Sequence, residues 1–193
     1  MKFSRVFLGV AGALLVLGSA QAADNVAPLG TASQSSLYSE KGPSRAIDGN
    51  TDGNYYNDSV MHTQAGAGYG VGNGYEWWQV SLDQSYTVDS ITVWNRTDCC
   101  TGRLSDFTVS LFSGSTLEWT GVYSQSGGPL PSTTFGAIDK VGDRVMVQLN
   151  RRDYLHMAEV QVFATAVPEP ETYALMLGGL AALSFVARRG RSV

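Results

Sequence analysis

Hydrophobic and polar residues alternate along most of the middle of this chain. The alternation is clearest at 77–82, 86–94, 107–112, 144–149 and 157–163. A period of two predicts β-strands with one buried face. Turn-forming residues separate the runs at 83–85, 113–115 and 127–129. Because no helical pattern interrupts these runs, the sequence predicts an all-β domain, an antiparallel β-sandwich or jelly roll, over residues 23–166.

The first 22 residues have the pattern of a secretory signal peptide. Lys2 and Arg5 precede an apolar core at 6–17, and Ser19 to Ala22 form a small-x-small cleavage site. A membrane anchor is the alternative, but this core is short for a span. Export would place the chain in an oxidising compartment, where a disulfide can persist.

The chain ends in a segment of different character, residues 167–193. A Val-Pro-Glu-Pro sequence at 167–170 breaks secondary structure, and an apolar run at 173–187 precedes three arginines. A helix of this length is marginal for a bilayer core of about 30 Å. The arginines fit the positive-inside rule and leave the preceding domain outside the cytoplasm. We therefore expect transient membrane association through this helix.

The charge balance narrows the possible partners. The chain has a net charge of −4 at pH 7 although both of its ends are basic, so the middle domain is more acidic than the whole. An acidic surface argues against binding nucleic acid or anionic lipid. It is compatible with a divalent cation and with neutral glycans.

The two cysteines of the chain are adjacent, Cys99 and Cys100, and lie between Arg96 and Arg103, with Asp98 beside Arg96 in sequence. The cysteines could bond to each other, bond to separate partners or remain free thiols. A bonded pair would present a flat apolar surface beside two guanidinium groups. That surface suits a ligand with hydroxyls on one side and a methyl or C–H face on the other, as in a deoxy sugar. Taken singly, the arginines could equally be ordinary surface ion-pair partners.

His62 and the segment 96–103 together resemble the signature of F-type lectins, or fucolectins: a histidine, then Arg-x-Asp, then four residues and a second basic residue. The likeness extends over about 25–163 and includes 46–50, 59–63, 77–82 and 158–162. It implies a discoidin-like fold that binds L-fucose.

The resemblance also implies roles for individual residues. His62, Arg96 and Arg103 would contact the ring and hydroxyl oxygens of the sugar. Asp98 would orient one or both guanidinium groups. A Cys99–Cys100 disulfide would pack on the sugar face, and Tyr56 would lie near the methyl group.

A structural calcium ion is a further implication of the resemblance. Its ligands would be the carboxylates of Asp48 and Glu159, an oxygen of Ser59, and the main-chain carbonyls of Arg45, Asn50 and Ala158. Hard oxygen ligands that include two carboxylates suit Ca²⁺. The alternative is an Asx-rich turn that holds no metal.

The last thirty residues resemble the PEP-CTERM sorting tail of Gram-negative bacteria. That resemblance implies recognition by an exosortase and delivery to the cell surface or extracellular matrix. A plain C-terminal anchor is the alternative. The glycine-rich segment 65–74 predicts a mobile rim loop or a flap over a binding site.

These observations predict an exported, non-enzymatic lectin for fucosylated or related glycans. The alternative is a structural or adhesive matrix protein with a discoidin-like fold and a degenerate sugar site. A glycoside hydrolase needs two carboxylates that face each other across a cleft. The arginine motif offers only Asp98.

Overall fold

The computed structural model of this protein describes residues 22–64, 75–167 and 170–189. The predicted signal peptide (except for residue 22), the glycine-rich segment 65–74, and residues 168–169 and 190–193 of the sorting tail lie outside the described residues.

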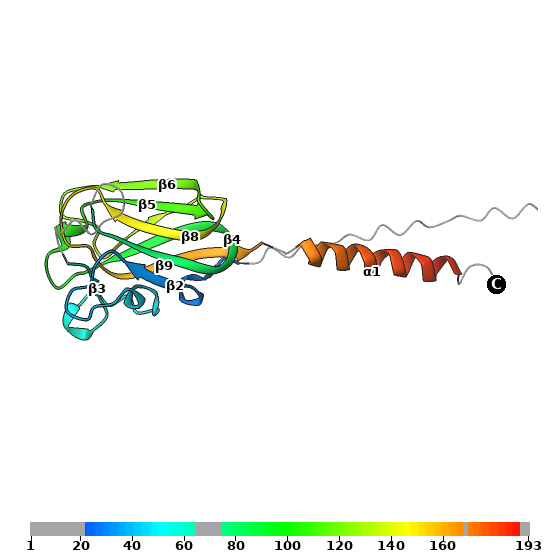
Figure 1. Cartoon of the computed structure of the whole chain (residues 1–193), viewed down its shortest axis with the longest axis horizontal. Helices are drawn as coiled ribbons and strands as arrows, with labels where there is room; N and C mark the ends of the chain where they lie inside the picture. The colour runs from blue at the N-terminus through cyan, green and yellow to red at the C-terminus, as the bar shows by residue number, and fades with distance from the viewer. Residues whose placement is uncertain (1–21, 65–74, 168–169, 190–193) are drawn as a thin grey trace, which may run out of the picture.

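Nine strands within the described residues pair in antiparallel fashion, which confirms the predicted all-β class (Figure 1). They are β1 (Asp24–Asn25), β2 (Thr31–Gln34), β3 (Met61–His62), β4 (Trp77–Asn95), β5 (Asp106–Ser113), β6 (Thr116–Ser124), β7 (Ser132–Phe135), β8 (Lys140–Leu149) and β9 (His156–Ala166). Short 3₁₀ helices lie at η1 (Ala27–Leu29), η2 (Pro43–Ile47), η3 (Tyr55–Asn57) and η4 (Thr101–Leu104), and α1 spans Pro170–Arg189.

The long strand β4 connects the two halves of the sandwich. Its first half pairs with β2 and β8, and its second half pairs with β9 and β7. The turn predicted at 83–85 is wrong, because the strand continues through it with a register shift between Ser81 and Tyr86. Such an irregularity lets one strand bend from one layer into the other without a chain reversal.

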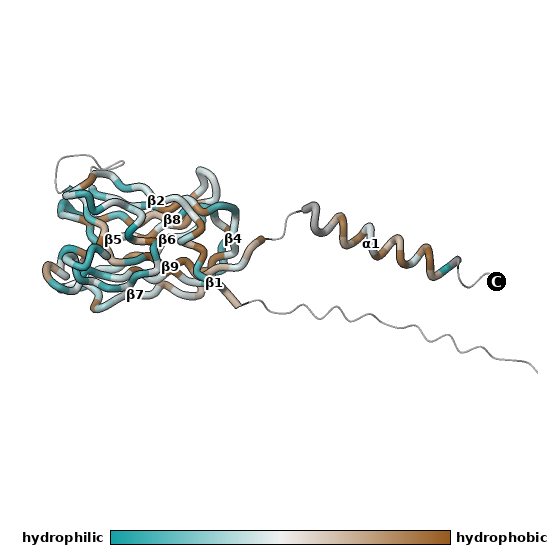
Figure 2. The backbone as a smooth tube through the Cα atoms, turned by 90° about the horizontal axis from the view of Figure 1, so that it is seen from below, coloured by the Kyte–Doolittle hydropathy of each residue, from teal (hydrophilic) through white to brown (hydrophobic). Residues whose placement is uncertain are grey.

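The buried faces of the strands form a single core. Phe107, Val109 and Leu111 of β5 are fully buried and alternate with partly exposed residues, as a period of two requires. Val145 and Val147 of β8 do the same. Figure 2 shows the hydrophobic stretches of the tube running along the strands.

Three segments that are distant in sequence meet at one end of the sandwich. β3 pairs with the start of β9, which sets His62 opposite His156. The end of β4 pairs with the same part of β9, where Asn95 lies opposite Met157. The loop that follows β4 therefore lies beside the segment that carries His62.

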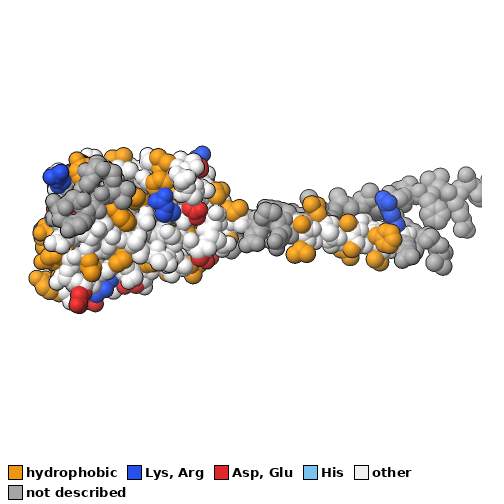
Figure 3. Space-filling model, in the orientation of Figure 1, with side chains coloured by type: hydrophobic (Ala, Val, Ile, Leu, Met, Phe, Trp, Pro, Cys, Tyr) orange, Lys and Arg blue, Asp and Glu red, His pale blue; other side chains and the backbone are white. Residues whose placement is uncertain are grey.

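The helix α1 follows β9 and lies outside the sandwich (Figure 1). Hydrophobic side chains cover much of its visible surface (Figure 3). Within the described part of the chain, no helix is long and apolar enough to cross a membrane.

Candidate functional site

The loop after β4 is braced by a buried asparagine. The Asn95 side-chain amide donates to the carbonyl of Thr101 at 3.1 Å and to that of Pro129 at 2.9 Å. The first hydrogen bond closes the loop 95–101, which contains Arg96 and the cysteines, and the second ties its base to the segment before β7. The loop therefore has a defined shape before any ligand arrives.

A glycine allows a second loop to lie directly against the first. The backbone N–H of Thr97 donates to the carbonyl of Gly53 at 2.8 Å. A Cβ on Gly53 would lie 2.5 Å from Thr97 Oγ1 and 2.7 Å from the carbonyl oxygen of Asn95. This close approach brings the adjacent Tyr55 and Tyr56 to the arginine loop.

Arg96 is held rigidly by Asp98. Its Nε and Nη2 donate to the two carboxylate oxygens at 2.8 Å each, and the guanidinium lies 4.4 Å from the centre of the Tyr55 ring. The backbone N–H of Tyr55 also donates to Asp98, at 3.1 Å. The hydrogen bonds from Arg96 lower the pKa of Asp98 to about 2, so the pair stays charged at ordinary pH.

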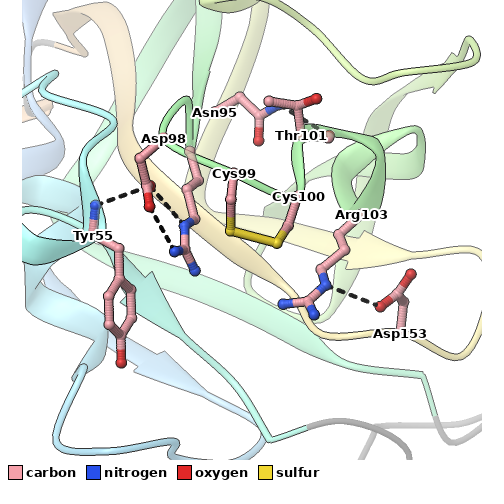
Figure 4. Close-up of a disulfide and its surroundings, with 9 residues drawn as sticks. Tyr55, Asn95, Asp98, Cys99, Cys100, Thr101, Arg103 and Asp153 are labelled. Carbon is pink, nitrogen blue, oxygen red and sulfur yellow. Dashed lines mark hydrogen bonds and ion pairs between the residues drawn. A yellow bond between two sulfur atoms is a disulfide. The ribbon is translucent and has the colours of Figure 1, made fainter.

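Cys99 and Cys100 are bonded to each other, so neither is a free thiol. Cys100 has a φ of +60°, and the 3₁₀ turn η4 begins directly after it. The disulfide lies between Asp98 on one side and Arg103 on the other (Figure 4). The structure thus presents the flat sulfur surface between the two guanidinium groups that the sequence suggested.

Arg103 does not share Asp98 with Arg96. Its Nε lies 3.7 Å from Oδ1 of Asp153, and its guanidinium lies 4.5 Å from the centre of the Tyr154 ring. Figure 4 draws the ion pair between Arg103 and Asp153. The prediction that Asp98 orients one or both arginines therefore holds for Arg96 alone, because both oxygens of Asp98 are already engaged there. No motif pointed to Asp153, which is far from Arg103 in the sequence.

His62 is buried and neutral. Its Nδ1 lies 2.6 Å from the carbonyl oxygen of Thr63, which can only accept, so Nδ1 carries the proton and Nε2 is left as an acceptor. Burial is the main cause that lowers the pKa of His62 to about 4, and the positive charges of Arg103 and Arg96 add to it. His156 stacks behind it with the ring centres 5.5 Å apart.

These groups surround a pocket of about 290 Å³. Its lining residues are Tyr38, Tyr55, Tyr56, His62, Arg96, Cys99, Cys100, Arg103 and Tyr154. Of the residues predicted for the sugar site, all but Asp98 line this pocket. Tyr55, the sequence neighbour of Tyr56 that could equally take the aromatic role, also lines the pocket. Tyr38 and Tyr154 could not be predicted, because single tyrosines in loops carry no signal of where they point.

The predicted calcium ligands lie around η2 and β9. Glu159 is fully buried, and its Oε1 accepts from the backbone N–H of Gly49 at 3.1 Å. Asp48 accepts from the N–H of Asn50 at 2.8 Å, as an Asx turn does. Ser59 donates to the carbonyl of Asn54 at 3.0 Å. Arg45 pairs through its side chain with Asp58, and Ala158 is buried in β9.

The residues around Glu159 fit a cation. Glu159 Oε2 is buried without a hydrogen-bond partner among the described residues. Burial raises the pKa of Glu159 to about 7, and the negative charge of Asp48 adds to that rise. A buried carboxylate of this kind, with the exposed Asp48 beside it, gains from a bound positive charge. Within the described ranges, no group of three or more His, Cys, Asp or Glu side chains is placed to hold a metal. The resemblance assigns the remaining ligands to Ser59 and to main-chain carbonyls.

Comparison with known proteins gives the same picture. Residues 45–147 match a NedA-like, galactose-binding domain of the F5/F8 type C class. Fucolectin-5 of Anguilla japonica is 34% identical over 153 residues, which is 73% of this chain and 76% of that protein. The chain belongs to the fucolectin family.

Solved structures agree with this membership. A fucose-binding module of Streptococcus pneumoniae is 31% identical, with a TM-score of 0.65 over 73% of this chain and 95% of that one. An F-type lectin from striped bass (Morone saxatilis) serum is 26% identical, with a TM-score of 0.64 over 77% of this chain and 50% of that one. Both structures share the discoidin-like sandwich fold with this chain.

The C-terminal segment has its own match. Residues 166–191 match the PEP-CTERM protein-sorting motif, which confirms the predicted sorting tail and indicates export with surface sorting in a Gram-negative bacterium. This fucolectin therefore combines a sugar-binding domain with a bacterial sorting signal.

Proposed function

We propose that this fucolectin is a non-enzymatic lectin that binds L-fucose-containing glycans at the cell surface or in the extracellular matrix. The observation that carries the proposal is the pocket in which Arg96 and Arg103 flank the Cys99–Cys100 disulfide. Relatives named as fucolectins and as a fucose-binding module support the choice of sugar.

The charge of the pocket favours a neutral ligand. Asp98 balances Arg96, His62 is neutral at pH 7, and Asp153, which Arg103 shares with Arg151, offsets part of the charge of Arg103. An anionic sugar would gain little from arginines that are already paired, whereas a hydroxyl can still accept hydrogen bonds from them.

The histidine adds a requirement for a hydroxyl. Since His62 Nε2 is an acceptor, its ligand atom must carry a hydrogen, which a ring ether oxygen lacks. A sugar hydroxyl can donate to His62 and accept from an arginine at the same time. The disulfide and the exposed ring of Tyr56 would then cover the methyl face.

Calcium would stabilise the loop next to this pocket. We propose that Glu159 and Asp48 hold Ca²⁺ together with Ser59 and the carbonyls of Arg45, Asn50 and Ala158. The support is the buried carboxylate oxygen of Glu159 that no described residue satisfies. The ion would tie the end of η2 to β9.

Titration of the purified protein with L-fucose by calorimetry tests the sugar proposal. The wild type and Lys140→Ala should bind alike, because Lys140 is an exposed residue at the start of β8, away from the pocket-forming end. Arg96→Ala should lose binding at least a hundredfold, since it removes the charged N–H groups that Asp98 leaves free to donate to the sugar. Binding to a glycan array that free L-fucose fails to compete would contradict the proposal. It would favour the matrix-adhesion alternative.

Display on a surface would compensate for a weak single site. A pocket that covers one sugar has few contacts, so the affinity of one domain should be low. Many copies sorted to one surface by the PEP-CTERM tail would bind a multivalent glycan with much greater avidity. We propose that this explains the pairing of lectin domain and sorting tail.

A further inference from the structure

Arg103 is held by a network that lies outside the lectin signature. Asp153, in the loop before β9, pairs through Oδ1 with Arg103 Nε at 3.7 Å and through Oδ2 with Arg151 Nη1 at 2.9 Å. The backbone N–H of Tyr154 donates to Asp153 Oδ1 at 2.8 Å and fixes the carboxylate. One carboxylate thus connects two arginines.

Arg151 holds the backbone of the turn that carries Arg103. Its Nη2 donates to the carbonyl of Gly102 at 2.6 Å and to that of Arg103 at 3.3 Å. Carbonyls near the end of a short helix lack partners within it, and a guanidinium is well shaped to satisfy two of them. Arg151 therefore anchors η4, and Asp153 restrains the side chain of Arg103, which projects from η4.

The two sugar-facing arginines differ in how firmly they are held. The Arg96 side chain is 8% exposed and makes a two-pronged contact with its own loop. The Arg103 side chain is 30% exposed and has one longer ion pair to a distant loop. A long side chain with few contacts must lose more rotamer freedom when it binds a ligand. Support from outside the loop therefore matters more for Arg103.

We propose that Arg151 and Asp153 are positioning residues that set the affinity of this pocket by holding Arg103 in its binding orientation. Neither residue lines the pocket, so they act through Arg103 and not by contact with the sugar. The inference rests on the proposed sugar-binding function. It assigns a role to the 151–154 loop that the family signature does not contain.

The test is a double-mutant cycle on L-fucose affinity measured by calorimetry. Asp153→Asn keeps the shape and the acceptor for Tyr154 but removes the charge. We expect about tenfold weaker binding in the wild-type background and no further loss in an Arg103→Lys background. Asp153→Glu should recover part of the affinity. Arg152→Gln, at the exposed neighbouring position, is the matched control and should bind as the wild type does.

A second measurement separates positioning from folding. The Nε–H signal of Arg103 in ¹H–¹⁵N spectra of the sugar-free protein should shift and broaden in Asp153→Asn, while that of Arg96 stays unchanged. The thermal midpoint should change by no more than a few degrees. These readouts follow the orientation of one side chain and would not respond to a general loss of structure.

The outcomes are distinguishable. Wild-type protein that binds L-fucose, with Asp153→Asn binding equally well, would overturn the positioning role. So would a loss that adds in full to that of Arg103→Lys. Wild-type protein that binds no L-fucose would overturn the proposed function itself.

Discussion

At the scale of single residues, each charged group in the pocket has a partner that fixes it. The short spacing between Arg96 and Asp98 made their pairing predictable, because two residues in one tight loop can meet without help from the fold. The partner of Arg103 was not predictable, since Asp153 reaches it from another part of the chain. His62 was predicted as a contact, but only the nearby carbonyl of Thr63 reveals that it accepts.

The disulfide should determine the preference for a methyl group. L-Galactose differs from L-fucose by a hydroxyl on C6, so it would place a polar group on the sulfur surface. Burying one carbon is worth about 0.8 kcal/mol, or about a fourfold preference for L-fucose. In Cys99→Ser/Cys100→Ser that preference should fall toward one, measured by calorimetry with both sugars. An unchanged ratio would show that the disulfide does not contact the methyl group.

Gly53 should be required for the approach of the two site loops. Gly53→Ala would press a Cβ against backbone and side-chain atoms of Asn95 and Thr97. We expect a loss of about 1–3 kcal/mol in the free energy of unfolding and weaker L-fucose binding. Denaturant titration and calorimetry measure the two effects. Gly136→Ala is the control, because nothing lies within 4 Å of its Cβ position. Equal behaviour of both variants would contradict the clash.

At the scale of elements, the clearest departures from the sequence prediction are β4 and β6. The polar residues at 83–85 look like a turn, but the strand continues because its two halves pair with different partners. β6 was missed because it is an edge strand, where Leu117 and Val122 are 52% and 63% exposed and obscure the alternation. Local patterns predict a strand best when one face is buried and the other is not.

Calcium should join the end of η2 to β9, and its removal should lower stability. At a calcium concentration of about 100 times Kd, binding adds about 2.7 kcal/mol, which raises the thermal midpoint by about 5–10 °C relative to EDTA. Glu159→Gln should abolish this response, because it removes the buried carboxylate charge. Asp143→Asn, which alters a carboxylate that accepts from Gly114 in another loop, should keep it. A wild-type midpoint that ignores both calcium and EDTA would contradict the site.

At the scale of the whole molecule, buried histidines should make the fold sensitive to mild acid. Burial lowers the pKa of His62 to about 4 and that of His156 to about 3. In the unfolded chain both histidines become protonated near pH 6.5. Below that pH the unfolded chain therefore binds protons that the folded state does not bind. The contribution of the two histidines to the free energy of unfolding should therefore be complete above about pH 6.5 and decrease as the pH falls toward 4.

The contribution of His156 can be isolated by substitution. Thermal midpoints of the wild type and His156→Leu, measured from pH 7 to 4 in excess calcium, should diverge in slope, with the variant less sensitive to acid. Glu159, whose pKa burial raises to about 7, acts in the opposite direction when no cation is bound. The difference between the two proteins is therefore the readout. Parallel curves would show that His156 does not titrate differently on folding.

The sequence by itself determined the strand-rich class, the sorting tail and the arginine–cysteine segment, because each depends on residues that are neighbours in the chain. Adjacent cysteines can form only one intrachain bond, and alternation predicts a strand whatever it pairs with. The tertiary structure alone decided that Arg103 uses Asp153, that His156 lies behind His62, and that Tyr38 and Tyr154 complete the pocket. Those contacts depend on which strands pair and in which register, and no local pattern encodes that choice.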